Sequence, residues 1–186
     1  MGSRRSHTDG PAASGFGRPQ PPQLLVWGSG VSEIITAAGG YLCDQARCGW
    51  DVTVLLADDC DVRPLTILGA TARLQQADAE SVLGALNRGQ GLLIGAERLA
   101  RGTEVHRALS RVLSRGANDV TVWGEPKHAR ADAGLEPAAH RLSSAARAFK
   151  AHALAAGGRP PCPTGAVGPT ESLFRIRRPL RGLYPV

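Results

Sequence analysis

The chain has 186 residues, 42% of them hydrophobic, and a formal net charge of +6. This length suits one domain whose core needs neither disulfides nor metal. No run approaches the roughly 18 apolar residues that span a membrane, and the first residues lack the apolar stretch of a signal peptide. We therefore expect a cytoplasmic protein with no membrane partner.

The positive charge is concentrated at the two ends of the sequence. Residues 1–23 carry a net +2 and residues 157–186 a net +4, which leaves residues 24–156 neutral. A domain that binds duplex nucleic acid carries basic charge on its folded surface, because phosphate neutralisation supplies most of the affinity. Nucleic acid is therefore not expected as a partner. The excess of Arg over Lys, with so much Ala, Gly and Pro, is typical of a high-GC bacterium.

The same two ends are crowded with Gly, Pro and Arg. Such composition cannot bury enough apolar surface to fold, and it predicts flexible tails. We expect a disordered tail over residues 1–23, a Rossmann-like α/β domain over residues 24–156, and a Pro/Gly/Arg-rich C-terminal tail over residues 157–186.

The first part of the expected domain is a β-turn-α-β unit. Residues 24–27 form a short apolar run closed by Gly28-Ser29-Gly30, and residues 51–56 form a β-branched run closed by Ala57-Asp58-Asp59. Between them Ser32 is the expected N-cap of a helix that continues to Gly49. The pair Gly39-Gly40 inside this helix indicates close packing against a neighbour, or a kink.

Further strands and helices alternate along the rest of the domain. We predict strands over residues 92–94 and 119–123, helices over residues 77–86, 103–116 and 142–156, and a short helical turn over residues 63–69. This alternation is typical of a parallel sheet with right-handed crossovers. The expected fold is a three-layer Rossmann-like or flavodoxin-like domain with about four parallel strands.

In such a sheet the carboxyl ends of the strands form the crevice where ligands bind. The candidate ligand-binding residues all follow a predicted strand, and they are identified by that position rather than by a motif. They are Gly28, Ser29, Gly30, Ser32, Asp58, Asp59, Glu97, Gly124 and Glu125. Asp58, Asp59 and Asp61 suit a divalent cation or sugar hydroxyls, and equally suit a soluble turn.

Dinucleotide binding is disfavoured, because Glu33 occupies the third glycine position of Gly-x-Gly-x-x-Gly and would repel phosphate. The long spacing from Gly28 to Gly49 resembles the first βαβ unit of the FMN-binding decarboxylases that act on phosphopantothenoylcysteine. The asparagine-containing phosphate loop of that family is missing, so the family is not assigned. No Walker-type phosphate loop is present, because no Gly-Lys-Ser or Gly-Lys-Thr occurs. The cofactor stays unknown.

Evidence for catalysis is equally sparse. His128 is the one candidate base, because it follows the fourth predicted strand and faces the expected crevice. The alternative is a solvated loop histidine. Cys43, Cys48, Cys60 and Cys162 lack Cys-x-x-Cys spacing, so no metal site is expected and free thiols are predicted.

Two further patterns leave alternatives open. Trp27 and Trp123 each stand at a predicted strand end, where they could wall a shared pocket or pack under neighbouring helices. Residues 173–184 alternate apolar and basic side chains, which suits an edge strand of the chain's own domain or a segment that binds an acidic protein partner.

The leading hypothesis is a non-catalytic Rossmann-like protein that binds a small polar ligand or a protein partner at the crevice. One alternative is an enzyme that acts on a nucleotide or phosphosugar there, with His128 as acid/base and Asp58 or Asp59 binding sugar hydroxyls or metal. Another is an interaction protein that works through its basic C-terminal tail. Whether the protein is an enzyme is left open.

Overall fold

The computed structural model describes residues 20–75, 78–100, 103–116, 118–124, 134–158 and 167–176. Its centre is a seven-stranded sheet in the order β3-β2-β1-β4-β5-β9-β6. The strands are β1 Gln23–Trp27, β2 Asp51–Leu56, β3 Thr71–Leu74, β4 Gly91–Gly95, β5 Val120–Trp123, β6 Leu135–Pro137 and β9 Leu173–Ile176. The first five pair in parallel, whereas β9 is antiparallel to both β5 and β6.

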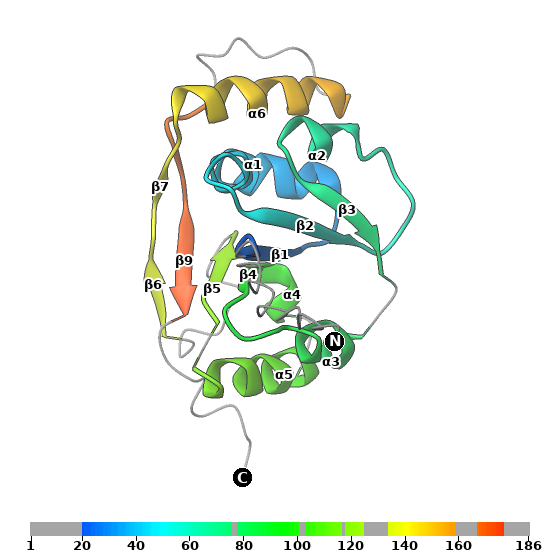
Figure 1. Cartoon of the computed structure of the whole chain (residues 1–186), viewed down its shortest axis with the longest axis vertical. Coiled ribbons are helices and arrows are strands. Elements are labelled where there is room, and N and C mark those ends of the chain that lie inside the picture. Colours follow the sequence, from blue (N-terminus) through cyan, green and yellow to red (C-terminus); the bar gives the residue numbers. More distant parts are fainter. Residues whose placement is uncertain are drawn as a thin grey trace, which may run out of the picture.

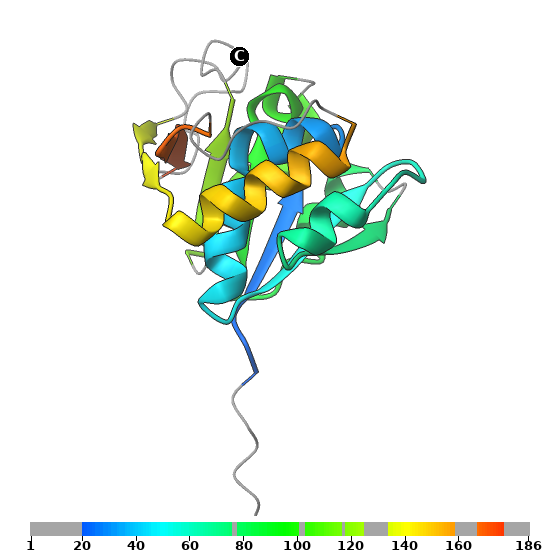
Figure 2. The same cartoon turned by 90° about the horizontal axis from the view of Figure 1, so that it is seen from above.

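Helices cover both faces of this sheet, which makes three layers (Figure 1). One face carries α1 Val31–Arg47, α2 Arg63–Ile67 and α6 Ser144–Ala156, and the other carries α3 Ala79–Gly84, α4 Ala96–Ala100 and α5 Thr103–Ser114. Each face has its own apolar core. The helix α6 lies across α1 and beside α2 (Figure 2).

The mixed α/β fold with a mostly parallel sheet is thus confirmed. All four predicted strands are present, and helices occupy most of the segments where they are expected. The strand β3 was not predicted, because Thr-Ala-Arg-Leu lies at the sheet edge with all four residues exposed and shows no apolar pattern. The expected cap is also wrong: α1 begins after Gly30, which caps it without a side chain, and Ser32 lies inside the first turn.

The Gly39-Gly40 pair confirms the prediction of close packing. A Cβ on Gly40 would lie 2.1 Å from Leu142 Cδ2, and a Cβ on Gly39 would lie 3.4 Å from Leu68 Cδ1. The helix α1 is therefore closely covered at this point by the segment leading into α6 and by the end of α2. The absence of side chains is what allows this approach.

The C-terminal boundary at residue 156 differs from what the structure shows. Residues 170–171 form β8, which pairs with β7 His140–Arg141, and β9 lies inside the main sheet between β5 and β6. Part of the expected tail therefore belongs to the folded domain. Residues 173–176 join the chain's own sheet, but as an interior strand rather than the expected edge strand, and residues 177–184 lie outside the described residues. The expected N-terminal tail lies outside the described residues up to residue 19.

The two tryptophans do not wall one pocket. Trp123 is fully buried in the core beneath α1, while Trp27 is 6% exposed and belongs to the core on the opposite face. The packing alternative is therefore what the structure shows. The ring of Trp123 explains Gly28, because a Cβ there would lie 2.7 Å from Trp123 Cζ2.

Candidate functional site

A cavity of about 590 Å³ opens where β1 and β2 end, between the start of α1 and the C-terminal end of α6. We call it the crevice. Its polar lining comes from the turn after β1, the first turn of α1 and the loop after β2, and most of its apolar lining comes from α1, α2 and α6. The lining residues are Ser29, Gly30, Val31, Ser32, Glu33, Ile35, Leu56, Ala57, Asp58, Cys60, Asp61, Pro64, Ala153, Leu154 and Gly157.

Four of the sequence-predicted site residues line this crevice. They are Ser29, Gly30, Ser32 and Asp58. Gly28, Asp59, Glu97 and Gly124 lie outside its lining. Glu125 and the candidate base His128 fall outside the described residues.

Two side chains, Glu33 and Arg98, hold the turn Gly28-Ser29-Gly30 that follows β1. Glu33 Oε1 accepts a hydrogen bond from Trp123 Nε1 at 2.8 Å, and its Oε2 accepts one from the Ser29 amide at 3.2 Å. Arg98 donates through Nη2 to the Gly28 carbonyl at 2.8 Å, and its guanidinium stacks 5.2 Å from the Trp27 ring centroid. These bonds fix the turn relative to the ends of β1, β4 and β5.

Glu33 was missed as a site residue. In the sequence it served only as an argument against pyrophosphate, and the structure shows a carboxylate that lines the crevice while orienting Trp123 and Ser29. Its place in the first turn of a helix was the available signal, since acids there often bond nearby amides. A carboxylate here also keeps the crevice unfavourable for a phosphate.

The loop after β2 is acidic, and the surroundings of its ionisable groups shift the pKa of Asp61 and the pKa of Cys60 in opposite directions. Asp61 accepts bonds from the Arg63 side chain at 2.7–3.0 Å, and hydrogen bonding to Arg63 lowers the pKa of this exposed carboxyl. Burial, followed by the charges of Asp59, Asp58 and Asp61, raises the pKa of the Cys60 thiol. Cys60 is therefore a protonated thiol at neutral pH and a weak nucleophile.

Glu97 occupies the first turn of α4 and does not line the crevice. Its Oε1 atom is buried and accepts no hydrogen bond within the part of the chain that the structure describes.

Among the same described residues, no three His, Cys, Asp or Glu side chains group closely enough to hold a metal ion. Nor is any described helix long and apolar enough to cross a bilayer.

No protein-family model and no curated protein matches this sequence. Solved structures do match. A triple mutant of the deacetylase from the teicoplanin biosynthetic pathway is 13% identical, with a TM-score of 0.55 over 82% of this chain and 97% of that chain. The deacetylase of the A40926 pseudoaglycone, Dbv21, is 13% identical, with a TM-score of 0.52 over 86% and 97% of the two chains.

A third similar structure is GalB, the 4-carboxy-2-hydroxymuconate hydratase from Pseudomonas putida. It is 12% identical, with a TM-score of 0.53 over 89% of this chain and 99% of that chain. Such low identities show a shared fold and nothing more specific, since one fold carries many functions. The fold and the site together define an α/β protein of Rossmann-like architecture with a crevice at the carboxyl edge of its sheet.

Proposed function

We propose that this protein binds a small polar ligand in the crevice and holds it without transforming it. The observation that carries the proposal is the cavity of about 590 Å³ at the carboxyl ends of β1 and β2. Ligands of open α/β sheets bind at that edge, and pockets of this size suit small molecules.

The lining indicates which ligand would fit. Ser29 and Ser32 offer hydroxyl groups, and Asp58 and Glu33 offer carboxylates, while the described lining contains no Lys, Arg or His. A ligand that donates hydrogen bonds, through hydroxyl groups or an amine, matches these acceptors. Leu56 and the other apolar lining residues would cover its carbon skeleton.

The alternative is an enzyme that works in the same crevice on a nucleotide or a phosphosugar. Its support is that the similar structures are called deacetylases and a hydratase, and that Asp58 lines the crevice as an available carboxylate. In this alternative His128 is the acid/base, and Asp58 or Asp59 binds sugar hydroxyls or a metal.

The third proposal is a protein partner bound by residues 173–184. In the structure Leu173–Ile176 already pairs with β5 and β6, so its backbone is committed to the sheet. A partner would then depend on the arginines that follow, which the described residues do not include.

The first experiment is native mass spectrometry of the full-length protein, with denaturing release and identification of any bound molecule. A retained metabolite with hydroxyl or amine groups would support ligand binding. A phosphorylated compound would contradict the ligand class, because the crevice presents Glu33 and Asp58. If nothing is retained, the same protein is screened by thermal shift against polyols, sugars and amines.

The variant that tests the site is Gly30→Trp. Gly30 lines the crevice, has an extended backbone at φ −174°, and leaves open space within 4 Å of an added Cβ, so we expect an indole placed there to occupy part of the crevice. The matched control is Gly84→Trp, because Gly84 is equally open but lies on α3 across the sheet. Gly30→Trp should abolish binding of the identified ligand and leave the melting temperature within a few degrees. Equal binding by both variants would refute the crevice as the site.

Turnover separates binding from catalysis. The purified protein is assayed on nucleotides and phosphosugars and for acetate release from acetylated small molecules. Turnover that falls at least about tenfold in Asp58→Asn or His128→Ala would establish the enzyme alternative. Binding without turnover would support the first proposal.

A further inference from the structure

A second cavity, of about 320 Å³, lies near the opposite end of the sheet from the crevice. It is formed where the C-terminal half of α1 faces the start of β5, the end of β9 and the connection from β6 to β7. None of its lining residues lines the crevice. They are Tyr41, Thr121, Glu136, Pro137, Ala138, Ala139, His140, Leu173 and Arg175.

Three polar side chains form a row along the floor of this second cavity. Thr121 on β5 is directly opposite Arg175 on β9, and Arg175 is directly opposite Glu136 on β6. Residues that face each other across antiparallel strands project from the same side of the sheet, with Cβ atoms about 5 Å apart. A hydroxyl, a guanidinium and a carboxylate are therefore side by side.

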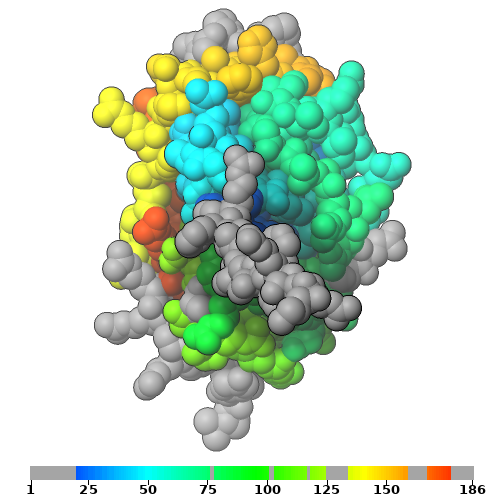
Figure 3. Space-filling view, in the orientation of Figure 1, coloured from blue at the N-terminus to red at the C-terminus, as the bar shows by residue number. Residues whose placement is uncertain are grey.

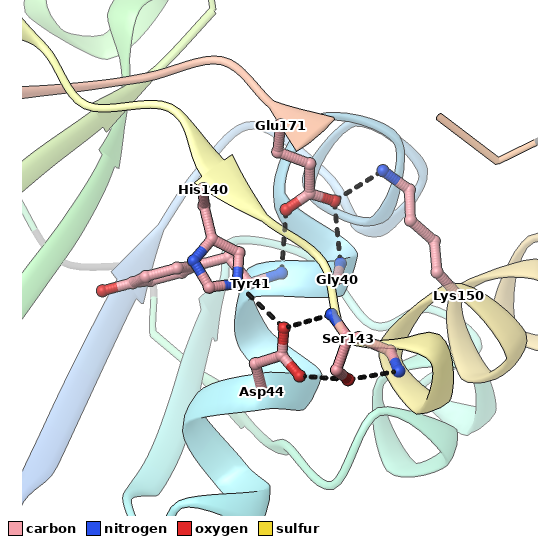
Figure 4. Close-up of polar contacts among 8 residues, drawn as sticks. Gly40, Tyr41, Asp44, His140, Ser143, Lys150 and Glu171 are labelled. Carbon is pink, nitrogen blue, oxygen red and sulfur yellow. Dashed lines mark hydrogen bonds and ion pairs between the residues drawn. The ribbon is translucent and has the colours of Figure 1, made fainter. Parts of the chain in front are cut away.

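Tyr41 and His140 form the opposite wall. Their rings meet edge to face, with centroids 5.1 Å apart and an interplanar angle of 87°. His140 Nε2 lies 2.9 Å from Asp44 Oδ2, and Ser143 donates to the same carboxylate from its amide and its hydroxyl. Figure 4 shows the second ring nitrogen of His140 pointing away from Asp44, so one imidazole nitrogen is not engaged by that carboxylate.

These groups favour a negatively charged ligand. Arg175 is exposed and permanently charged, and its planar fork matches the geometry of a carboxylate. Burial raises the pKa of the Tyr41 hydroxyl, against the opposing effects of Arg175 and Thr121, so the phenol is a neutral donor at physiological pH. Leu173 and Pro137 supply apolar surface beside the polar row.

We propose that the second cavity binds a small organic carboxylate, with Arg175 as its anchor. The hydroxyls of Tyr41 and Thr121 donate to the same carboxylate, and the apolar part of the ligand packs against Leu173 and Pro137. Asp44 acts as a positioning residue that fixes the His140 ring.

The test is titration of the ¹⁵N-labelled full-length protein with butyrate, followed by amide chemical shifts. Butyramide serves as the neutral probe of the same shape, and inorganic phosphate as the non-carboxylate anion. We expect saturable shifts at Thr121, Ala138 and Arg175 with butyrate, and at least about tenfold weaker binding of the other two probes.

Variants of the lining residues test whether butyrate binds in this cavity. Arg175→Gln should weaken butyrate binding at least about tenfold, because it replaces the charged guanidinium with a neutral amide. Tyr41→Phe should weaken it about threefold to tenfold, because it removes one hydroxyl donor. Arg107→Gln is the matched control, since Arg107 is an exposed arginine on α5 across the sheet. It should leave binding unchanged.

Three results would overturn the proposal. The first is equal binding of butyrate and butyramide, which would remove the role of the charge. The second is phosphate binding as tight as butyrate binding, which would make this a general anion site. The third is the absence of shifts at this cavity at 50-fold molar excess over protein, whether or not shifts occur in the crevice at Ser32 and Asp58.

Discussion

Glu171 accepts the backbone amides of Gly40 and Tyr41, each at 2.8 Å, although it lies 131 residues from Gly40 in the sequence. A side-chain carboxylate thus binds two consecutive backbone amides in the middle of α1. Lys150 completes the arrangement, because its Nζ lies 2.6 Å from Glu171 Oε1 (Figure 4). The same Nζ donates to the Thr36 carbonyl at 2.7 Å. The strand β8, the helix α6 and the middle of α1 are joined at this one point.

Loss of Lys150 should therefore be costly. The Lys150 and Glu171 side chains are 9% and 4% exposed, and removing one partner of a buried ion pair leaves an uncompensated charge. We expect Lys150→Met to lower the free energy of unfolding by about 3–5 kcal/mol in urea denaturation. Arg107→Met on exposed α5 is the control, with an expected change below about 0.5 kcal/mol. A loss below about 1 kcal/mol for Lys150→Met would show that the pair contributes little.

For Gly40→Ala, packing and helix propensity predict opposite changes in stability. Alanine is worth about 1 kcal/mol more than glycine in an ordinary helix. At Gly40 the added Cβ would lie 2.1 Å from Leu142 Cδ2 and 3.1 Å from Glu171 Oε1, so both must move. We expect Gly40→Ala to destabilise the protein by about 1–3 kcal/mol.

The control for Gly40 is Gly84→Ala in α3. A Cβ at Gly84 meets no atom within 4 Å, so this change should be neutral or stabilising by up to about 1 kcal/mol. Urea denaturation of the two variants side by side makes the comparison. If both shift stability in the same direction by similar amounts, close packing does not explain the glycine pair.

The glycine pair also shows how far the sequence predicts this structure. Gly39-Gly40 predicted close packing correctly because the cost of glycine in a helix demands a local reason. The partner that packs there, Leu142, has no sequence signal, since it comes from a segment about one hundred residues later. In the same way β5 was predicted from its Val-Thr-Val pattern, whereas β3, exposed along its whole length, was not.

The candidate site, too, was predicted only in part from the sequence. Ser29, Gly30, Ser32 and Asp58 were predicted because each follows a strand, and strand ends of a parallel sheet meet at one edge. The wall formed by α6 could not be predicted, because nothing in an alanine-rich helix indicates which neighbours it covers. In the space-filling view the yellow and orange atoms of α6 lie directly beside the cyan atoms of α1 (Figure 3).

Glu33 should control the environment of Trp123. Glu33→Ala removes the acceptor of the indole N–H, and Trp123 is fully buried, so a donor is left unsatisfied at a cost of about 1–3 kcal/mol. We expect an upfield shift of the Trp123 Nε1–H resonance and loss of stability in Glu33→Ala. Glu33→Gln keeps a carbonyl acceptor and should restore most of both. An unchanged indole resonance in Glu33→Ala would show that this hydrogen bond is absent in solution.

The acid dependence of stability should depend in part on Asp44. Burial alone would raise the pKa of this carboxyl, but hydrogen bonds from Ser143 and His140 hold it below the ordinary value of 3.8. Since the folded pKa is depressed, the stabilisation is fully present above the unfolded pKa and is lost as the pH falls through the folded pKa. Urea midpoints measured between pH 2 and pH 6 should therefore fall less steeply at the acid end in Asp44→Asn than in the unaltered protein. Parallel curves for the two proteins would contradict this assignment.

Removal of residues 167–186 separates the two views of the C-terminal segment. As a loose tail it would be dispensable, and the truncated chain would melt like the full chain. The structure predicts the opposite, because the truncation deletes β9 from the sheet and leaves Lys150 buried without Glu171. We expect the truncated protein to lose its cooperative thermal transition. A truncation after Ile176 is the control, because it keeps β8 and β9 and should melt within a few degrees of the full chain.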